Sequence, residues 1–502
     1  MSLIHPWQRR IMWVSIPLVA FLLHISFFVG YLASDDMLYM AQAQRYLDGN
    51  FAPPVTHWGF RYTVVLPLTL LGQYFDFTEP LLASVSLAYW YALIIAVAWF
   101  LHGEFGQPAA LTGAILVATL PLFVVWSTIL GVDITEALFL FMAFALFFRA
   151  ESSPSFRATN YFFAGLCVGL AVLTRETAYG FLIVLGVFFI AGGYRRWRGY
   201  IAGLIGIAVV LFAEWTYYLV FDEGILYRFQ AIAGSHGTIG IKSGDFTAGT
   251  GNVSHNRLIG PFAAILLNQE FALLYWFAIA AAFYVYRYGD ERYRKLLGYV
   301  LVTGIVYFLW IGYSGAIRPL PRYFAFVSVL AVVLIAMMVI SIKSWARRAV
   351  LMLLLLGANI AALSVENIYP RFSSKTVGEF AAQSFDPVVT DPRSAWQAKT
   401  FARILGMRQG EVVDYTNEIN GPAIYAHVDG IEVPDWVARR LSDAELVLEK
   451  DPPKLLAGHV LDWTGIGTVL PERLYHYLAI RNPAVRFYRI SADDTPPPYP
   501  GT

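Results

Sequence analysis

Two adjacent carboxylates, Asp35 and Asp36, directly follow the first long apolar run of the chain, residues 11–32. A charged side chain is costly at membrane depth, so a pair at the end of such a run is expected to have a partner or a function. A carboxylate at this position can remove the proton of a hydroxyl group or bind a metal ion. We take the pair as the candidate catalytic residues, with an ordinary helix N-cap as the alternative.

Other acidic residues also lie where apolar runs begin or break. Asp133 and Glu136 are three residues apart, which places them on one face at the start of a helix. There they could instead simply interact with the positive end of that helix. Arg175 and Glu176 interrupt an apolar tract and point in different directions, and local pairing at a helix break is the alternative to a site there. We predict that Asp133, Glu136 and Glu176 contact substrate.

Arginines accompany these acids. Arg318 and Arg322 precede a late apolar run, where a bound anion would account for them. Arginine matches phosphate in charge and in geometry, so a carboxylate base with several arginines suits transfer of a group from a phosphate or diphosphate to a hydroxyl. Outside the cytoplasm the donor would be lipid-linked. Arg257 is a further basic candidate, and His57, His236 and His255 are ordinary loop residues under the simplest interpretation.

The composition is that of a multi-pass membrane protein. Of 502 residues 58% are hydrophobic and 14% charged, with a mean hydropathy of +0.56, whereas soluble domains carry roughly 25% charged residues. Apolar runs of about 20 residues indicate helices, because barrel strands would be about 10 residues long and alternating. The net charge of +1 gives no electrostatic case for a nucleic-acid partner, and the single cysteine, Cys167, excludes an intrachain disulfide.

About eleven runs are long enough to cross the membrane. They are residues 11–32, 80–101, 107–127, 131–149, 159–174, 177–193, 199–221, 268–287, 296–313, 323–342 and 347–365. The first exceeds the length of a signal-peptide core, so we read it as an uncleaved helix. Five basic clusters then fall on one side, which the positive-inside rule makes cytoplasmic. These are Arg9 and Arg10; Arg149 and Arg157; Arg195, Arg196 and Arg198; Arg287, Arg292, Arg294 and Lys295; and Lys343, Arg347 and Arg348.

The candidate residues fall on the opposite, outer side. Residues 33–79 there contain a predicted surface helix, 36–47, and an apolar segment, 61–75, expected to be re-entrant or interfacial. The glycine-rich loop 222–267 is either a disordered connection or a lid ordered by substrate. Residues 366–492 alternate short strand-like and helix-like runs, which predicts a small α/β domain, and residues 493–502 are expected to be a disordered tail.

Residues 1–365 resemble the GT-C superfamily of polyprenyl-phosphate-sugar glycosyltransferases. The resemblance is strongest to glycosyltransferase family 39, which includes protein O-mannosyltransferases and bacterial aminoarabinose transferases. It is carried by ordered motifs after the first span: Asp35-Asp36-x-x-Tyr39-x-Ala41, Arg61-Tyr62, Asp133-x-x-Glu136, Leu173-Thr174-Arg175-Glu176-Thr177 and Pro321-Arg322-Tyr323.

The resemblance implies an inverting transfer in which an acid of the first outer loop is the base. That role carries over to Asp35 or Asp36, and we favour Asp35. Contacts with the donor phosphate carry over to Arg61, Arg175 and Arg322. We add Arg318 to these contacts and predict that Tyr39 and His57 contact substrate. The metal-binding arrangement of some family members is not evident in the sequence, so we expect no metal or other cofactor, although a divalent cation stays possible.

We therefore predict an α-helical, multi-pass inner-membrane enzyme with a cytoplasmic N-terminus and an extracytoplasmic C-terminal domain. It would move a sugar from a polyprenyl phosphate to a hydroxyl of a lipid, polysaccharide or protein. A transporter or flippase is the alternative, but it would place charges near span midplanes and broken helices in paired halves. An O-antigen-ligase-like or structural membrane scaffold without catalysis is the third hypothesis.

Overall fold

The computed structural model describes residues 6–152, 157–238, 258–314, 320–404, 411–416, 419, 421–442 and 444–491. The chain divides into two compact units. Unit 1 comprises Met1–Phe28, Leu38–Asp76 and Pro80–Leu363, and unit 2 comprises Val29–Met37, Phe77–Glu79 and Ser364–Thr502. The predicted tail, 493–502, and residues 239–257 of the glycine-rich loop lie outside the described residues.

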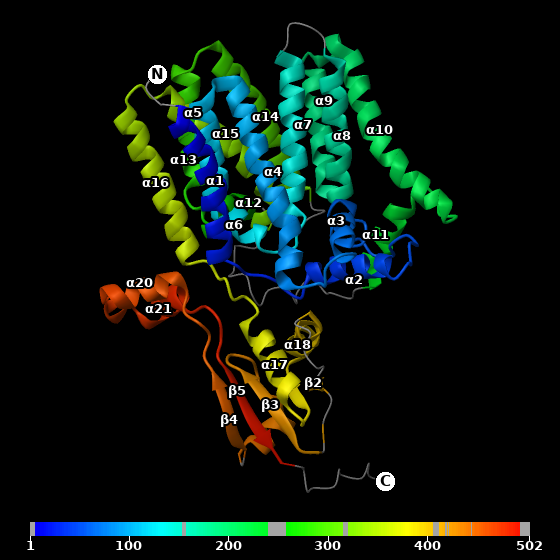
Figure 1. Ribbon diagram of the computed structural model, residues 1–502, viewed down its shortest axis with the longest axis vertical. Helices are drawn as coiled ribbons and strands as arrows, with labels where there is room; N and C mark the ends of the chain where they lie inside the picture. Colours follow the sequence, from blue (N-terminus) through cyan, green and yellow to red (C-terminus); the bar gives the residue numbers. More distant parts are fainter. Residues whose placement is uncertain are drawn as a thin grey trace. The chain divides into compact units, whose positions relative to one another are not determined.

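Unit 1 is helical, and Figure 1 shows its long helices running side by side. One helix accounts for most of each predicted span: α1 (Pro6–Ser26), α4 (Glu79–Phe105), α5 (Gln107–Thr119), α7 (Asp133–Ser152), α8 (Ala158–Thr174), α9 (Gly180–Ile190), α10 (Trp197–Val220), α13 (Leu274–Tyr288), α14 (Glu291–Tyr313), α15 (Ala325–Ser341) and α16 (Trp345–Ser364). The other helices are α2 (Asp35–Leu47), whose first turn belongs to unit 2, α3 (Tyr62–Gly72), α6 (Pro121–Ser127), α11 (Tyr227–Thr238) and α12 (Gly260–Leu266).

Among the described residues, five helices are long and apolar enough to cross a membrane by themselves: Glu79–Phe105, Gly193–Val220, Glu291–Tyr313, Pro321–Ser341 and Trp345–Ser364. The pair α5 and α6, bent by 60° at Leu120, would make a sixth. The count of eleven spans stays a prediction. The end predicted for the first span, Leu32, is wrong: α1 stops at Ser26, because the chain turns through Gly30 (φ 77°) and Ala33 (φ 48°).

Helices α8 and α10 approach each other closely through glycine. A Cβ atom at Gly165 would overlap the carbonyl oxygen of Gly203, and one at Gly206 would overlap that of Phe162. Small residues spaced by four allow this contact between membrane helices, where backbone packing rather than the hydrophobic effect drives association. The position of α8 matters for the site because its C-terminal end carries Arg175.

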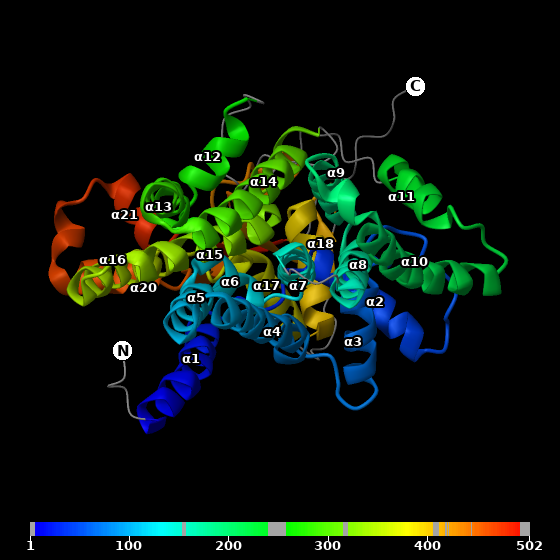
Figure 2. The ribbon, with the colours of Figure 1, turned by 90° about the horizontal axis from the view of Figure 1, so that it is seen from above.

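Helix α15 lies inside the bundle and packs against α5, α7, α13 and α14, as Figure 2 shows from above. Nearly all of its side chains are buried, which fits an apolar sequence with no charged residue over Ala325–Ser341. A helix that is apolar on all sides is expected in the centre of a bundle. It therefore fixes the depth at which Arg322, just before its N-terminal end, is held.

Three of the predicted basic clusters meet at one end of unit 1. Glu104, at the end of α4, pairs with Arg149 of α7 at 3.5 Å and with Arg292 of α14 at 3.1 Å. Arg196 donates to the carbonyl of Ala150 at 2.8 Å. These contacts confirm that the ends of α4 and α7 and the starts of α10 and α14 share one side, as the charge pattern predicted.

Unit 2 contains a five-stranded mixed sheet of order β2-β1-β3-β5-β4. The strands are β1 (Val388–Thr390), β2 (Val412–Asp414), β3 (Ala423–Val428), β4 (Glu445–Lys450) and β5 (Val485–Ile490). Strands β1, β2 and β3 are parallel, while β5 runs antiparallel to β3 and β4. Its helices are α17 (Phe372–Gln383), α18 (Pro392–Ile404), α19 (Asp435–Leu441), α20 (Leu456–Thr464) and α21 (Glu472–Ala479).

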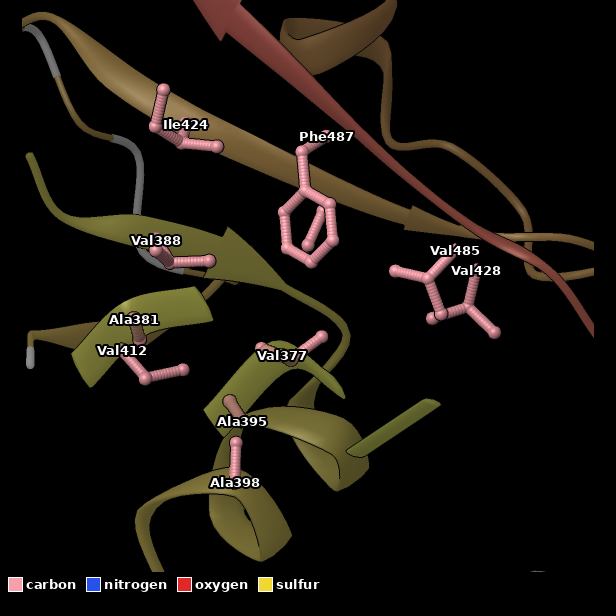
Figure 3. Close-up of a cluster of buried hydrophobic side chains, with 11 residues drawn as sticks. Val377, Ala381, Val388, Ala395, Ala398, Val412, Ile424, Val428, Val485 and Phe487 are labelled. Atoms are coloured by element: carbon pink, nitrogen blue, oxygen red, sulfur yellow. The ribbon is translucent and has the colours of Figure 1, made fainter. Parts of the chain in front are cut away.

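The α/β character predicted for residues 366–492 is confirmed, with three elements that the pattern did not reveal: α17, β4 and α20. One face of the sheet packs on α17 and α18 through a core that includes Val377, Val388, Ala398 and Phe487 (Figure 3). Phe380 stacks on Phe487 with ring centroids 4.1 Å apart. This core shows that the domain buries apolar surface of its own.

Candidate active site

The break between α8 and α9 is the centre of the charged part of unit 1. Helix α8 ends at Thr174, Arg175 is extended (φ −166°, ψ 147°), and a single turn of 3-10 helix, Glu176–Tyr179, leads into α9. Because Arg175 is extended, its side chain and that of Glu176 reach different partners. The predicted break, and the different directions of its two charged side chains, are both confirmed.

On one side of the break, Glu176 joins two arginines. Its Oε2 lies 2.5 Å from Nη1 of Arg61, just before α3, and its Oε1 lies 3.0 Å from Nη2 of Arg228 on α11. Arg228 also pairs with Glu214 of α10 at 3.0 Å and donates to the carbonyl of Val172 at 2.9 Å. Two carboxylates thus neutralise two guanidinium groups, and only Glu176 is appreciably exposed, at 29% of its side chain. We call these four charged residues the Glu176 network.

On the other side of the break, Arg175 donates to Oδ1 of Asp133 at 2.7 Å. Oδ2 of Asp133 lies 3.9 Å from Nε of Arg322. The guanidinium of Arg175 stacks on Tyr323 at 3.6 Å, and that of Arg322 lies 4.8 Å from the ring centre of Trp126. Asp133 thus orients two arginines, of which Arg322 is the more exposed, at 21% against 12% of the side chain.

Glu136, one turn after Asp133, is buried and serves a different purpose. It accepts hydrogen bonds from Thr177 and from the hydroxyl of Tyr307, the latter at 2.7 Å. Trp310 donates to the carbonyl of Thr177 at 2.9 Å. Glu136 thereby ties α7 to the break and to α14, and at 4% exposure it has little surface left for a substrate.

The two adjacent aspartates open α2 with different environments. Asp36 is 2% exposed, and its carboxylate accepts backbone N–H groups of Leu32 at 2.5 Å, Ser34 at 2.7 Å and Met37 at 3.0 Å. Burial raises the pKa of Asp36 to about 6, an effect that these hydrogen bonds oppose. Asp35 is partly exposed at the first position of the helix. Asp36 therefore shapes the loop, and Asp35 is the more accessible carboxylate.

The remaining predicted residues are placed as follows. Tyr39 lies one turn after Asp35 on the same face of α2, is 2% exposed, and is near enough to Arg175 for an electrostatic interaction. His57 packs on Trp58 with ring centroids 3.7 Å apart. His236 lies on α11. Arg318, His255 and Arg257 lie outside the described residues.

Two members of the Glu176 network were missed from the sequence. Glu214 lies within the apolar run 199–221, and a carboxylate inside a predicted span is itself a signal of a buried partner. Arg228 fell within a segment read as a loop, and its burial depends on contacts that no local pattern reveals. In the described part of the chain, no three or more His, Cys, Asp or Glu side chains are grouped so as to hold a metal ion.

Comparisons with known proteins bear on the fold and on part of the chain. Residues 70–218 match the family described as dolichyl-phosphate-mannose-protein mannosyltransferase. The structure is similar to that of ArnT from Cupriavidus metallidurans in the apo state, with a TM-score of 0.55 and 14% identity over 86% of this chain and 95% of that one. ArnT bound to undecaprenyl phosphate gives a TM-score of 0.50 and 14% identity over 87% and 96%.

The apo oligosaccharyltransferase of Archaeoglobus fulgidus is also similar, with a TM-score of 0.53 and 14% identity over 84% of this chain and 66% of that one. No match was found among curated protein sequences. The structural matches cover between 84% and 87% of this chain, and they confirm the fold predicted from the ordered motifs. The family match contains the break and four of the charged residues around it: Asp133, Arg175, Glu176 and Glu214.

Proposed function

We propose that this chain is a membrane glycosyltransferase of the GT-C superfamily and that it transfers a sugar from a polyprenyl-phosphate donor to a hydroxyl group outside the cytoplasm. The observation that carries the proposal is the family match over residues 70–218, together with a fold similar to that of ArnT along most of the chain. ArnT has been crystallised with undecaprenyl phosphate, which supports a donor of that class here.

In the proposed reaction Asp35 is the base. The acceptor hydroxyl attacks the anomeric carbon, its proton passes to the Asp35 carboxylate, and the bond to the phosphate oxygen breaks with inversion. The polyprenyl phosphate leaves with the bonding electrons. Asp35 suits this role better than Asp36, because the two oxygens of Asp36 already accept three backbone N–H groups.

The leaving phosphate gains charge as its bond to the sugar breaks, so cationic donors stabilise the transition state. We assign this role first to Arg322, which is partly exposed and held between Asp133 and Trp126. Arg318 would assist. Arg175 and Arg61 each contact a carboxylate closely, so their contribution is to position the site and to balance its charge.

The test is transfer by the purified full-length protein in lipid nanodiscs supplied with a labelled polyprenyl-phosphate sugar and envelope lipid or glycan acceptors. Released polyprenyl phosphate and labelled acceptor are both measured. Removing a general base typically costs about 10²–10⁴-fold in rate, so Asp35→Asn should lose transfer by that factor while keeping its fold. Asp48→Asn, just beyond the other end of α2, is the matched control. Full activity of Asp35→Asn would remove Asp35 as the base.

We further propose an inner-membrane location with a cytoplasmic N-terminus and an extracytoplasmic unit 2. The gathering of the basic clusters at one end of unit 1 supports this orientation under the positive-inside rule. Protease added to sealed spheroplasts should cleave within residues 364–502. The sugar and the acceptor follow from mass spectrometry of envelope glycans and lipids from cells with and without the protein.

A further inference from the structure

A helical hairpin in unit 2 exposes large hydrophobic side chains. It consists of α20, a 3-10 turn over Ile466–Val469, and α21. Of the eleven large hydrophobic side chains exposed among the described residues after Ser364, seven lie on this hairpin, so the exposure is concentrated there. The seven are Leu456, Val460, Trp463, Ile466, Val469, Leu474 and Tyr477. Figure 1 shows α20 and α21 side by side, apart from the strands of the same unit.

The spacing of these residues makes the exposure systematic. Leu456, Val460 and Trp463 follow the i, i+4, i+7 pattern of one helix face, and Trp463 is 87% exposed. The two helices meet instead through small residues, because Gly458 packs against Ala479. A hairpin in water would normally turn its large apolar residues inward, so this face is built to be covered.

Charge is balanced over the hairpin and the residues that flank it. Lys454 pairs with Asp462 at 2.6 Å, and Tyr475 donates to the same carboxylate at 2.7 Å. Between residues 451 and 481 there are three cationic side chains, Lys454, Arg473 and Arg481, and three acidic ones, Asp451, Asp462 and Glu472. The hairpin with its flanking residues, 451–481, therefore has no net charge, and attraction to a charged partner does not explain its surface.

We propose that this hairpin inserts its apolar face into the interfacial layer of the membrane that holds the protein. Unit 2 is joined to membrane helices at three places: Val29 follows the end of α1 by three residues, Glu79 begins α4, and Ser364 ends α16. These short tethers keep the domain at the bilayer. Tryptophan and tyrosine, such as Trp463 and Tyr477, are enriched at the level of lipid headgroups, where an amphipathic helix lies about 5–10 Å deep.

The test uses single cysteines in the full-length protein, with Cys167→Ser as background, reconstituted in nanodiscs. Trp463→Cys and Tyr477→Cys place a solvent-sensitive fluorophore on the apolar face. His476→Cys, an exposed position about 100° around α21 from Tyr477 and about 200° from Leu474, is the matched control. Lipids carrying a doxyl quencher near the headgroup should quench the first two probes at least twofold more than the third. Because insertion is apolar, that ratio should not change between about 0.05 M and 0.5 M salt.

Equal lipid quenching at positions 463 and 476 would overturn the proposal. So would a probe at position 463 that is shielded from iodide in water yet not quenched by lipid, since protein would then cover the face. A ratio that collapses at high salt would indicate electrostatic adhesion and would equally contradict insertion.

Discussion

Replacement of Arg228 by methionine is expected to destabilise unit 1 strongly. Arg228 is 3% exposed, and its guanidinium donates hydrogen bonds to Glu214, Glu176 and the carbonyl of Val172. Without it, Glu214 keeps one described partner, the hydroxyl of Tyr218 at 2.5 Å, and its charge is buried without compensation. Removing one partner of a buried ion pair typically costs about 3–5 kcal/mol. We expect this loss as a lower thermal midpoint in detergent, followed by fluorescence-detected size exclusion.

The double variant Arg228→Met with Glu214→Leu is the control for this reasoning. It removes both charges, and replacing a buried ion pair by apolar groups is often close to neutral. The double variant should therefore recover more than half of the lost stability. Arg228→Lys should recover less, because one ammonium cannot reach two carboxylates and a carbonyl in the same geometry. An Arg228→Met protein as stable as the parent, or a double variant no better than the single one, would refute the account.

Three further changes test other parts of the structure. Gly165→Leu should separate α8 from α10 and lower the thermal midpoint, whereas Gly186→Ala on α9, where a Cβ atom meets nothing within 4 Å, should not. Burial raises the pKa of Asp36 to about 6 from 3.8, so the native state holds this proton more tightly and stability should fall as pH rises from about 4 to 6, by on the order of 3 kcal/mol. Asp36→Asn should flatten that part of the pH profile of the thermal midpoint, and an unchanged profile would contradict the assignment. Arg322→Lys keeps the charge but loses the planar contact with Trp126. The KM for the lipid donor should therefore rise at least several-fold while the fold stays intact. An unchanged KM and kcat would exclude Arg322 from the donor site.

Much of the helical fold could be predicted because its determinants are local. Each apolar run of about 20 residues contains a helix. The break at Thr174-Arg175-Glu176 is indicated by two charged residues within an apolar tract. The end of α1 was misplaced because apolarity continues to Leu32, while the turn at Gly30 and Ala33 is set by the backbone. Strand β4, Glu-Leu-Val-Leu-Glu-Lys, is not predicted from the sequence, because an edge strand with mostly exposed side chains lacks a strongly apolar pattern.

The sequence predicts which residues belong to the candidate site better than it predicts which of them pair with one another. Asp133, Arg175, Glu176 and Arg61 were singled out because charge next to an apolar run is costly. Which carboxylate meets which arginine depends on the packing of α3, α7, α10 and α11, and that information is not local. The pairing changes the interpretation of Arg61 and Arg175, whose close carboxylate contacts leave Arg322 as the better candidate for a phosphate.

The two aspartates of α2 show how identical neighbours acquire different chemistry. In sequence they are equivalent, and either could be a base. In the structure the loop before α2 folds over Asp36, which satisfies three backbone N–H groups that would otherwise be unpaired in a buried turn. Asp35 begins the helix with its side chain partly exposed, one turn before Tyr39. A base must reach the acceptor, which the partly exposed Asp35 can do, whereas the buried Asp36 holds the backbone in place. Asp35→Asn should therefore lower the rate of transfer, and Asp36→Asn should change the pH dependence of stability.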